Sequence, residues 1–373
     1  MSRLFVCAGE PSGDARAAEL IRELGAVRDI EVMGFGGPEL ESSGARLVDR
    51  MSGYAVMGFW EVLAGLPALV RLYRRLRRSI IEWAPDALVL VDYPGMNLRL
   101  ARWASRRGIP VVYYVSPQIW AWGSGRVRSV ARHVTLMLTL FRFEKDFYDS
   151  HGAKAVWVGH PIVDALREQS WPPSEEPVPQ RLAILPGSRA QEVRRNLPVM
   201  LDALRILLEG GVVSEASLSV HTGLDPALYD SAGEFPCLTR TFSVPDALRG
   251  ASAAAVCSGT ATLETALRGV PLVVVYRTSP VTYLLARLLV RGVRQIALAN
   301  LVTGSASIPE LIQGKATGPA IALALEQLIR SDVQERSTLA SKLAGVREAL
   351  GPPGAAARAA AEVDRLLGAS GDA

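Results

Sequence analysis

The chain has 373 residues, of which 49% are hydrophobic and 21% charged, and its mean hydropathy is +0.19. This composition excludes an intrinsically disordered chain, and the length suggests two domains. Three widely separated cysteines exclude a disulfide framework and a cysteine zinc site, which favours a reducing compartment. The net charge of +4 is too small for a dedicated nucleic-acid binder, so no nucleic-acid partner is expected.

Arginine supplies most of the positive charge. Only four of the 41 basic residues are lysines, and the other 37 are arginines. The guanidinium group binds phosphate and carboxylate through two parallel hydrogen bonds, which suits anionic ligands. A bias in genomic composition explains the same excess equally well, and motif counts alone do not separate the two explanations.

Apolar runs alternate with helical patterns in the first half of the chain. We predict strands over residues 4–8, 31–35, 87–91, 111–115, 135–140 and 155–158, with a helix over 15–24. The runs at 87–91 (ALVLV) and 111–115 (VVYYV) are continuous, as in strands that are buried on both faces. The alternation predicts an α/β domain with a parallel sheet.

A second α/β series follows a proline-rich linker. Residues 168–180 (EQSWPPSEEPVPQ) contain four prolines and three acids without periodicity. Beyond them we predict strands over 182–185, 217–222, 253–257 and 272–276, a helix over 191–209, and terminal helices from 331 onward. We therefore predict an α/β fold with two Rossmann-like domains, over residues 1–167 and 181–345, which face each other across a cleft and precede a helical tail over 346–373.

The most apolar stretch, residues 54–70, is too short for a membrane span and contains Glu61 and Pro67. The apolar run at the N-terminus is also too short for a signal peptide, so we expect a cytoplasmic protein. Apolar residues recur at helical spacing across this stretch, and a cluster of five arginines over residues 71–78 follows it. Such a helix suits an anionic membrane surface, but the pattern alone favours an ordinary core-facing helix with a solvated basic end.

Three motifs follow predicted strands of the first domain. In residues 9–14 (GEPSGD), Glu10 and Asp14 could accept sugar hydroxyls, or Ser12 or Asp14 could cap the next helix. In residues 91–97 (VDYPGMN), Asp92 could act as a general base, or it could initiate a turn. In residues 116–122 (SPQIWAW), Trp120 or Trp122 could stack on a sugar ring, although packing in the core or between domains explains the motif better.

Two further motifs join strands to helices in the second domain. In residues 185–189 (LPGSR), the turn offers backbone donors and Arg189 can bind phosphate, whereas the alternative is a plain turn. In residues 258–264 (SGTATLE), amides and hydroxyls at a helix N-terminus suit a diphosphate, and Glu264 could accept ribose hydroxyls. None of the four histidines has metal-ligand spacing, and His160 is interpreted as structural, so no metal site is predicted.

Taken together, these segments closely resemble the lipid-A-disaccharide synthases, the bacterial glycosyltransferases that join two acylated glucosamine units. The resemblance covers most of the chain and runs through GEPSGD (9–14), AVMGFWEVL (55–63), VDYPGMN (91–97), YVSPQIWAW (114–122), FEKDFY (143–148), VGHPIVDA (158–165), LPGSR with Glu192 (185–192), SGTATLE (258–264) and LANL (298–301). One departure is Gly95, where some members of the family carry an aspartate, so Asp92 is the only acid of its loop.

The resemblance implies a glycosyltransferase-B-type fold and a metal-free, cofactor-free, inverting transfer. The implied donor is UDP-2,3-diacylglucosamine, the acceptor is 2,3-diacylglucosamine 1-phosphate, and the products are the β-1,6-linked disaccharide 1-phosphate and UDP. It implies Asp92 as the catalytic base; Glu10, Ser12 and Asn300 near the acceptor or the reacting sugar; and Ser188, Arg189, Ser258, Gly259, Thr260 and Glu264 at the UDP group.

The acylated substrates also change the interpretation of the apolar helix. They favour a membrane-facing surface formed by Phe59, Trp60, Leu63, Leu66, Leu69, Arg71, Arg74 and Arg75, on a protein peripherally associated with the inner membrane. The acyl-chain length stays open, and so does a homodimer, because the terminal helices could pack on the first domain or swap between subunits. Two alternatives compete with this function. One is another UDP-sugar enzyme of the same fold, such as a UDP-N-acetylglucosamine 2-epimerase or a polyprenyl-linked glycosyltransferase, and the other is a non-catalytic lipid- or nucleotide-binding protein.

Overall fold

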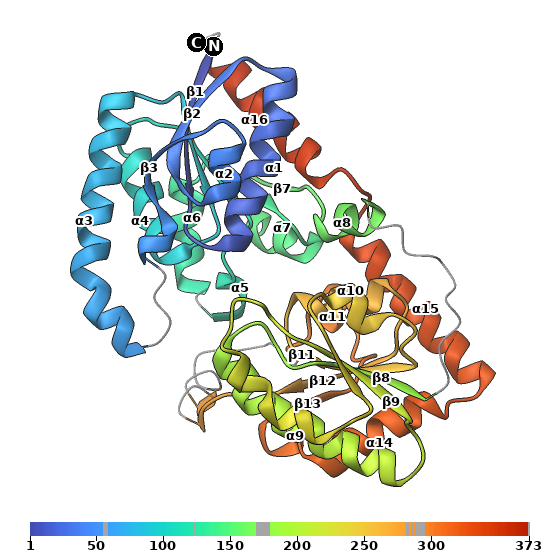
Figure 1. The fold of residues 1–373 in the computed structure, drawn as a ribbon. Helices are drawn as coiled ribbons and strands as arrows, with labels where there is room; N and C mark the ends of the chain where they lie inside the picture. The colour runs from blue at the N-terminus through green and yellow to red at the C-terminus, as the bar shows by residue number, and fades with distance from the viewer. Residues whose placement is uncertain are drawn as a thin grey trace. The chain divides into compact units, whose positions relative to one another are not determined.

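The computed structural model describes residues 1–54, 59–122, 124–168, 180–280, 283–284, 287 and 295–371. The chain divides into two compact units (Figure 1). Unit 1 contains Met1–Glu168 together with Leu350–Ala373, and unit 2 contains Gln169–Ala349. The end of the chain therefore belongs to the same unit as its beginning.

Unit 1 is built on a seven-stranded parallel sheet of order β3-β2-β1-β4-β5-β6-β7. Its strands are β1 (Ser2–Ala8), β2 (Ile30–Gly36), β3 (Arg46–Arg50), β4 (Ala87–Val91), β5 (Val111–Tyr114), β6 (Leu136–Thr139) and β7 (Ala155–Trp157). The order runs outward from β1 in both directions, so the sheet is doubly wound. In such a sheet ligands bind at the carboxyl ends of the strands, near the point where the order reverses. Here that point lies between β1 and β4.

Helices cover both faces of this sheet. They are α1 (Pro11–Val27), α2 (Pro38–Ser42), α3 (Phe59–Trp83), α4 (Pro94–Ser105), α5 (Ile119–Trp122), α6 (Val127–His133), α7 (Arg142–Asp149), α8 (Ile162–Glu168) and α16 (Ala355–Gly371). Buried side chains of α3, α4 and α6 form one core cluster with Phe5, Cys7, Leu88 and Leu90 of β1 and β4. Because side chains alternate along a strand, the neighbouring residues Leu4, Val6 and Ala8 face the opposite layer, where α1 lies.

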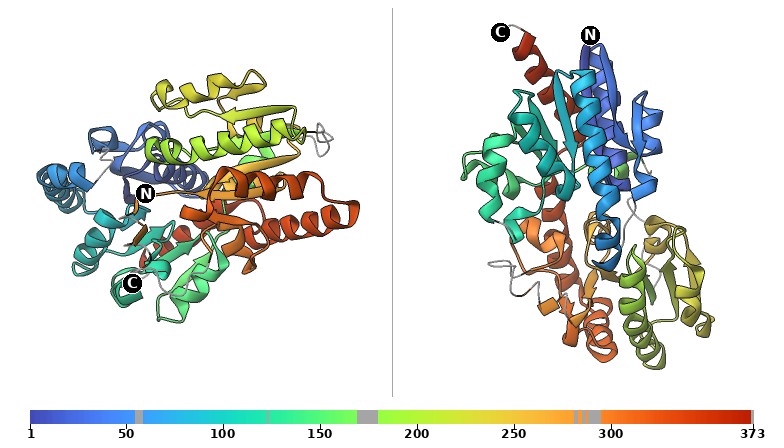
Figure 2. Two further views of the ribbon diagram at one scale, coloured as in Figure 1. Left: turned by 90° about the horizontal axis from the view of Figure 1, so that it is seen from below. Right: turned by 90° about the vertical axis from the view of Figure 1, so that its left-hand side faces the viewer.

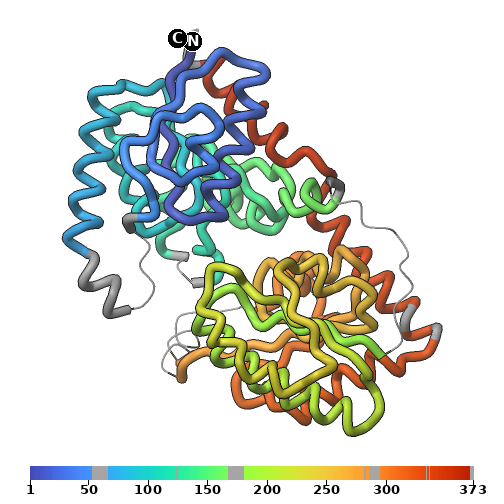
Figure 3. Tube along the Cα trace, in the orientation of Figure 1, coloured from blue at the N-terminus to red at the C-terminus, as the bar shows by residue number. Residues whose placement is uncertain are grey.

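The C-terminal helix α16 packs along α1 within this chain (Figure 3). Arg28, which follows α1, forms an ion pair with Asp364 of α16. The carboxylate of Asp164 accepts hydrogen bonds from the backbone N–H groups of Gly354 and Ala355 at the start of the same helix. The last helix therefore completes the layer that α1 begins.

Helix α3 buries one side and exposes another. Leu72, Leu76 and Ile80 recur every four residues and are fully buried against the sheet, and Figure 2 (right) shows α3 lying in front of the strands of unit 1. Leu66 and Val70 lie elsewhere on the helix and are 43% and 45% exposed. Within the described residues, no helix combines the length and apolar composition that a membrane span requires.

Unit 2 repeats the design with a six-stranded parallel sheet of order β10-β9-β8-β11-β12-β13. Its strands are β8 (Arg181–Leu185), β9 (Glu215–Ser219), β10 (Leu238–Thr241), β11 (Ala253–Cys257), β12 (Leu272–Tyr276) and β13 (Glu310–Ile312). Its helices include α9 (Ala190–Glu209), α10 (Val244–Leu248), α11 (Thr260–Leu267), α13 (Leu298–Thr303), α14 (Gly318–Ile329) and α15 (Val333–Leu350). The core lies where α9 and α14 pack on the sheet.

The predicted strands all exist, with ends shifted by a few residues. The sequence reading missed β3, β10 and β13, which lie at three of the four sheet edges. Their side chains are half-buried or exposed, so they lack the continuous apolar run that marks a strand buried on both faces. The predicted linker, apart from Glu168 and Gln180, lies outside the described residues.

Candidate active site

The switch point of unit 1 brings together the ends of three neighbouring strands. Glu10 lies two residues after β1, Asp92 directly follows β4, and Ser116 follows β5. Because β1, β4 and β5 are parallel neighbours, these residues lie at one edge of the sheet. Sequence reasoning placed Asp92 and Glu10 at this edge, and the structure brings them close enough for their charges to interact.

The backbone at this edge is strained. Asp92 and Tyr93 both have φ of 48°, and Val115, at the end of β5, has φ of 62°. Left-handed backbone is uncommon outside glycine, and for a β-branched residue such as valine it is an outlier. The sequence predicted that this strand ends at Val115. The left-handed backbone of Val115 explains why β5 ends one residue earlier, at Tyr114. Strain of this kind concentrates at functional sites and persists only where the surrounding structure enforces it.

Several hydrogen bonds hold Asp92 in this conformation. Its backbone N–H donates to the carbonyl of Tyr114 at 3.0 Å. Its carbonyl accepts from the Tyr113 hydroxyl at 2.7 Å and from the Asn97 side-chain amide at 2.8 Å. Asn97 and Tyr113 are buried, so they fix the backbone and leave the Asp92 carboxylate to project from it. Asn97 belongs to the VDYPGMN motif and Tyr113 to the VVYYV run, but nothing in the pattern assigned them this role.

Gly9 is required by close contact with Tyr93. A Cβ atom at Gly9 would lie 2.3 Å from the Cδ1 atom of the Tyr93 ring, which is far inside van der Waals contact. The aromatic ring therefore lies directly against the backbone of the GEPSGD turn. This contact joins the loop after β1 to the loop after β4 and so positions Glu10 relative to Asp92.

Burial and a neighbouring charge raise the pKa of Asp92 from 3.8 to about 6. Desolvation is the main cause, because removing the carboxylate from water disfavours its charged form. The carboxylate of Glu10 adds to the shift by like-charge repulsion. At neutral pH Asp92 is therefore ionised but more basic than an ordinary aspartate, which suits a group that takes a proton from a hydroxyl.

Asp14 is a structural residue and caps a helix other than its own. Its side chain is 1% exposed, and its two oxygens accept from the backbone N–H groups of Gly37, Glu39 and Leu40 at the start of α2. It has no surface left for a sugar hydroxyl. The alternative that Ser12 or Asp14 caps α1 is also wrong, because the N-cap is Glu10, which makes no side-chain capping bond. Ser12 is exposed beside it.

The tryptophan-rich motif is anchored by a buried acid. The indole N–H of Trp120 donates to Glu144 at 3.2 Å, and the second oxygen of Glu144 accepts from the backbone of Phe141 at 3.3 Å. The Trp120 ring also meets the edge of Phe143 at 4.9 Å between centroids. Packing thus explains Trp120, while the side chain of Trp122 lies outside the described residues. His160 is buried with its pKa lowered to about 3, chiefly by desolvation, which fits the structural role expected for it.

Glu144 supports a prediction about the pH dependence of stability. Burial raises its pKa from 4.5 to about 7, so the folded protein retains a proton that the unfolded chain loses at lower pH. Stability therefore falls as the pH rises through this window. Glu144→Gln cannot ionise, and we expect its melting temperature to improve relative to wild type between about pH 5 and about pH 8. Thermal melts of both proteins across that range test this, and a difference independent of pH would contradict it.

In unit 2, the turn from β11 into α11 has the geometry of an anion site. Gly259 has φ of 149°, and a Cβ atom there would meet nothing within 4 Å among the described residues. The turn is therefore open toward the first N–H groups of α11, which lack intrahelical acceptors by helix geometry. Thr260 is exposed at the first position of the helix, while the Ser258 hydroxyl donates to the carbonyl of Ile296 at 3.0 Å.

The second predicted phosphate turn, after β8, is occupied by a carboxylate of the same chain. Glu192 accepts from the backbone N–H groups of Ser188 and Arg189 at 3.1 and 3.3 Å, and its other oxygen pairs with the Arg189 guanidinium at 3.0 Å. The turn is thus a capping box at the start of α9, not the set of open backbone donors that the sequence suggested. Arg189 itself is 67% exposed on its side chain, so its role at a phosphate stays a prediction.

Asn300 lies inside the unit and connects loops. Its side chain is buried, donates to Glu310 at 2.7 Å and to the carbonyl of Ile308 at 2.9 Å, and accepts from the N–H of Ile308. Glu310 in turn accepts from the N–H groups of Ile296 and Ala297. The segment that bonds Ser258 is therefore held by the Asn300–Glu310 pair. These contacts describe a positioning residue, and the contact with a sugar inferred from the family resemblance stays a prediction.

Asn196 was missed by sequence reasoning. It is buried on α9, where its amide donates to the carbonyl of Pro186 and its oxygen accepts from the N–H of Arg277. It also contacts the sulfur of Cys257 at the end of β11. One side chain thus links the carboxyl ends of β8, β11 and β12. The only feature of the sequence that could have indicated this role is a polar residue on the apolar face of a helix.

Glu264 pairs with a buried arginine. Arg268 directly follows the last residue of α11, its side chain is 1% exposed, and the pair is 3.1 Å apart. Glu264→Gln would remove this carboxylate from a buried guanidinium, and we expect a loss larger than the roughly 1 kcal/mol that an exposed pair contributes. We expect a corresponding fall in the free energy of unfolding, measured by chemical denaturation.

Glu326→Gln is the matched control for this variant. It breaks a pair of the same spacing, with Arg330, in which both side chains are exposed. An exposed pair contributes at most about 1 kcal/mol. Equal losses in the two variants would contradict the role assigned to burial.

Five of the eight predicted membrane-facing residues have described side chains, and four of these five are exposed. Leu66, Arg71 and Arg74 are exposed, whereas Leu69 is half-buried against the core cluster of the sheet. Arg75 is exposed but forms an ion pair with Asp49 at 2.6 Å. Leu69 is therefore a correction to the predicted surface. The side chains of Phe59, Trp60 and Leu63 lie outside those described.

Solved structures of the same architecture place the chain in a fold class. A structure titled as the glycotransferase of kitacinnamycin matches with a TM-score of 0.68 and 18% identity, over 98% of this chain and 99% of that one. A UDP-GlcNAc 2-epimerase from Neisseria meningitidis matches with a TM-score of 0.63 and 14% identity, over 98% and 99%. At such identities the likeness concerns the fold alone. With the two parallel-sheet units, it confirms the predicted glycosyltransferase-B-type α/β class.

Relatives in sequence are more specific. A sequence model of the family described as Lipid-A-disaccharide synthetase matches residues 4–356. A lipid-A-disaccharide synthase of Myxococcus xanthus is 40% identical over 98% of this chain and 97% of its own, and one of Acidobacterium capsulatum is 38% identical over 95% and 93%. The chain belongs to the lipid-A-disaccharide synthase family, and it is a glycosyltransferase of lipid A biosynthesis. The resemblance found in the motifs is thereby confirmed.

Proposed function

We propose that the chain transfers 2,3-diacylglucosamine from UDP-2,3-diacylglucosamine to 2,3-diacylglucosamine 1-phosphate. The products are the β-1,6-linked lipid A disaccharide 1-phosphate and UDP, and the anomeric carbon is inverted. The observation that carries the proposal is Asp92, a carboxylate with a raised pKa on strained backbone at the switch point of a doubly wound sheet. Family membership supplies the class of reaction.

The proposed step is a direct displacement. Asp92 takes the proton of the acceptor 6-hydroxyl, the hydroxyl oxygen bonds to the anomeric carbon, and the bond from that carbon to the diphosphate oxygen breaks. The electron pair of the broken bond leaves with UDP. Inversion in one displacement needs a single base, and no second acid is present in the loop of Asp92. Glu10 and Ser12 are proposed to contact the acceptor or the reacting sugar beside it.

Unit 2 is proposed to bind the leaving UDP. Charge develops on the diphosphate as the bond breaks, and fixed donors stabilise it best. The N-terminus of α11, with Ser258, Gly259 and Thr260, supports this role because no described residue crowds its turn and its dipole favours an anion. Ser188 and Arg189 are proposed to bind the diphosphate as well, after it displaces the Glu192 carboxylate from their N–H groups. Glu264 is proposed to contact the ribose. Asn300 is proposed to act beside the reacting sugar.

We propose that the reaction requires no metal ion and no cofactor. Arg189 and the start of α11 can offset the charge of the leaving group, which is the task a divalent cation performs in other transferases. Activity that persists in EDTA would agree with this proposal, and activity abolished by EDTA and restored by a divalent cation would contradict it.

The exposed part of α3 is proposed to rest on the inner membrane. Leu66 and Val70 are exposed apolar residues on a helix whose next turns carry Arg71 and Arg74. Apolar side chains beside arginines suit an anionic membrane surface, and acylated substrates must be drawn from a membrane. The inner leaflet is therefore the proposed site of action, with the protein peripherally bound to it.

An assay with both acylated substrates tests the function. Formation of the disaccharide 1-phosphate and UDP, with the β configuration read by NMR, is the expected result. Tight binding of UDP without turnover would favour the non-catalytic alternative. Conversion of UDP-N-acetylglucosamine to its 2-epimer would favour the epimerase alternative, whose fold unit 1 and unit 2 share.

A further inference from the structure

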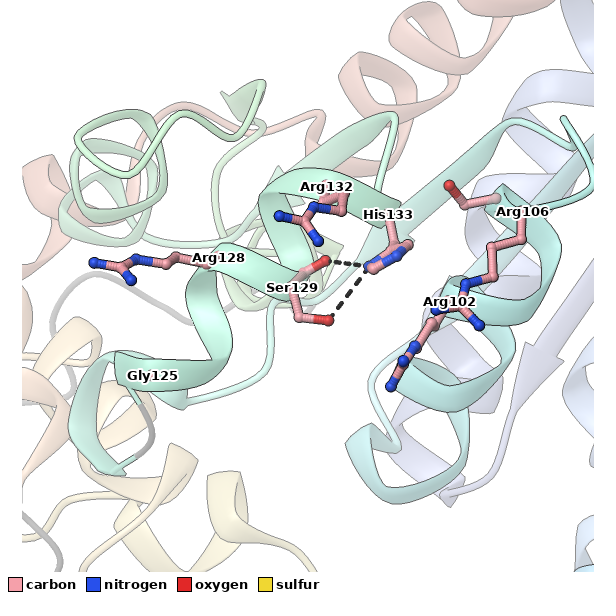
Figure 4. A pocket seen from close by; sticks show the side chains of 8 residues that line it. Arg102, Arg106, Gly125, Arg128, Ser129, Arg132 and His133 are labelled. Atoms are coloured by element: carbon pink, nitrogen blue, oxygen red, sulfur yellow. Dashed lines mark hydrogen bonds between the residues drawn. The ribbon is translucent and has the colours of Figure 1, made fainter.

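An arginine-rich pocket lies between α4 and α6 of unit 1, away from the residues discussed so far. Its volume is about 580 Å³, within the range of pockets that bind small ligands. Arg102, Arg106, Arg128, Arg132, Ser129 and His133 line it, and Figure 4 shows that they come from the two helices, with Arg128 extending outward from α6. No aspartate or glutamate is among its lining residues.

The four guanidinium groups lack carboxylate partners. Among the described residues, none of the four has an Asp or Glu oxygen within 4.0 Å. Other arginines of unit 1, such as Arg16, Arg50 and Arg75, do have such partners. The pocket thus concentrates positive charge that the protein itself leaves uncompensated.

The spacing of the arginines adds repulsion between like charges. Arg102 and Arg106 are four residues apart at the end of α4, and Arg128 and Arg132 are four residues apart on α6. Like charges at this spacing repel each other on a helix surface. An anion between the two pairs would relieve both repulsions at once and could accept paired hydrogen bonds from guanidinium groups.

The helix dipole does not explain the cluster. Cations are favoured in the last turn of a helix, which accounts for Arg102 on α4 and Arg132 on α6. Arg128 lies at the second residue of α6, where the same dipole disfavours a cation. Its presence there, among the residues that line the pocket, therefore needs another cause.

The pocket is also separate from the proposed catalytic residues. Asp92 precedes the first residue of α4, whereas Arg106 follows its last residue. A helix of 12 residues is roughly 18 Å long at 1.5 Å per residue, so the two lie at opposite ends of α4. A ligand in the pocket would not touch Asp92.

We propose that this pocket binds phosphate groups, either of an anionic phospholipid headgroup or of a soluble phosphorylated molecule. Arginine is the residue best matched to phosphate because its planar donors fit two phosphate oxygens together. The hydroxyl of Ser129, which lies 3.3 Å from Nδ1 of His133, adds a polar group to the lining. The proposed phosphate site takes no part in glycosyl transfer, so it would be a second binding function of unit 1.

Calorimetric titration with inorganic pyrophosphate at low ionic strength tests the site. We expect Arg128→Ala/Arg132→Ala to weaken binding at least about tenfold, and Arg102→Ala/Arg106→Ala to do the same from the other helix. The control Arg330→Ala/Arg365→Ala removes the same charge from exposed, paired arginines and should bind as wild type does. Arg189→Ala should retain the component that the pocket variants lose, which separates this site from the proposed UDP site.

Vesicles distinguish the two sources of phosphate. If pocket variants lose sedimentation with vesicles containing phosphatidylglycerol, while none of the proteins responds to phosphatidylcholine alone, the ligand is a lipid headgroup. If only pyrophosphate binding is lost, the ligand is soluble. Wild-type binding of both probes by the pocket variants would overturn the proposal, and so would an equal loss in the control, which would indicate unspecific attraction of anions.

Discussion

Asp92→Asn is expected to lower kcat by about 10²–10⁴-fold, the usual contribution of a general base. Asparagine has the same shape, and it tolerates the left-handed backbone that residue 92 adopts, whereas alanine does not. The loss should therefore reflect chemistry and not a rearranged loop. Initial rates with both acylated substrates measure it, and a variant with the wild-type rate would contradict the assignment.

The pH profile gives a second test of the same residue. Because the pKa of Asp92 is about 6, wild-type activity should fall as the pH drops through that value and the carboxylate becomes protonated. The residual activity of Asp92→Asn should lack this step. A step retained unchanged in the variant would assign the titration to another group.

The same substitution should stabilise the fold. Between about pH 4 and about pH 6 the folded protein holds a proton on Asp92 that the unfolded chain has lost, so stability falls as the pH rises. Asparagine avoids this loss, and the variant should melt at a higher temperature at about pH 7. A catalytic carboxylate that costs stability is the expected compromise at an active site.

Asp14→Asn is expected to lower the free energy of unfolding by about 2–3 kcal/mol. The aspartate oxygens accept from three backbone N–H groups at the start of α2. An asparagine can present an oxygen to Gly37 and Leu40, but its NH₂ group then faces the N–H of Glu39. A buried donor without an acceptor costs about 1–3 kcal/mol. Chemical denaturation of both proteins measures the change.

The control for Asp14→Asn is Glu41→Gln, which removes an equally sized charge from the same segment. Glu41 pairs with Arg50 on the surface, and the side chains are 44% and 65% exposed. Such a pair contributes at most about 1 kcal/mol. If the Asp14 variant were no less stable than this control, the capping role of the buried carboxylate would be wrong.

The sequence predicted the interior of both sheets and the edge where Asp92 lies. Strands buried on both faces, such as residues 87–91 and 253–257, carry a continuous apolar signal, and the residue after such a strand must lie at the carboxyl edge. The short strands β3, β10 and β13 carry no such signal, because their side chains are half-buried or exposed.

The partners of polar side chains could not be predicted. Asp14 caps a helix 24 residues away, Asn300 bonds Glu310 on another element, and Glu192 occupies the turn predicted for phosphate. Each pairing depends on how loops meet in space, and local spacing contains no information about it. The arginines of the α4–α6 pocket show the same limit, since only the packing of two helices brings Arg106 and Arg128 to one cavity.

The return of the chain to unit 1 has a consequence for its covalent topology. Unit 1 contains both termini, so the polypeptide passes between the units once after Glu168 and again at Leu350. A single break in residues 169–179 would leave the two units joined through the second connection. A chain shortened at Ala349 would keep all of unit 2 yet remove α16 from α1, including the partner of Arg28. A deletion at the C-terminus therefore removes part of unit 1, which is otherwise formed by the first 168 residues.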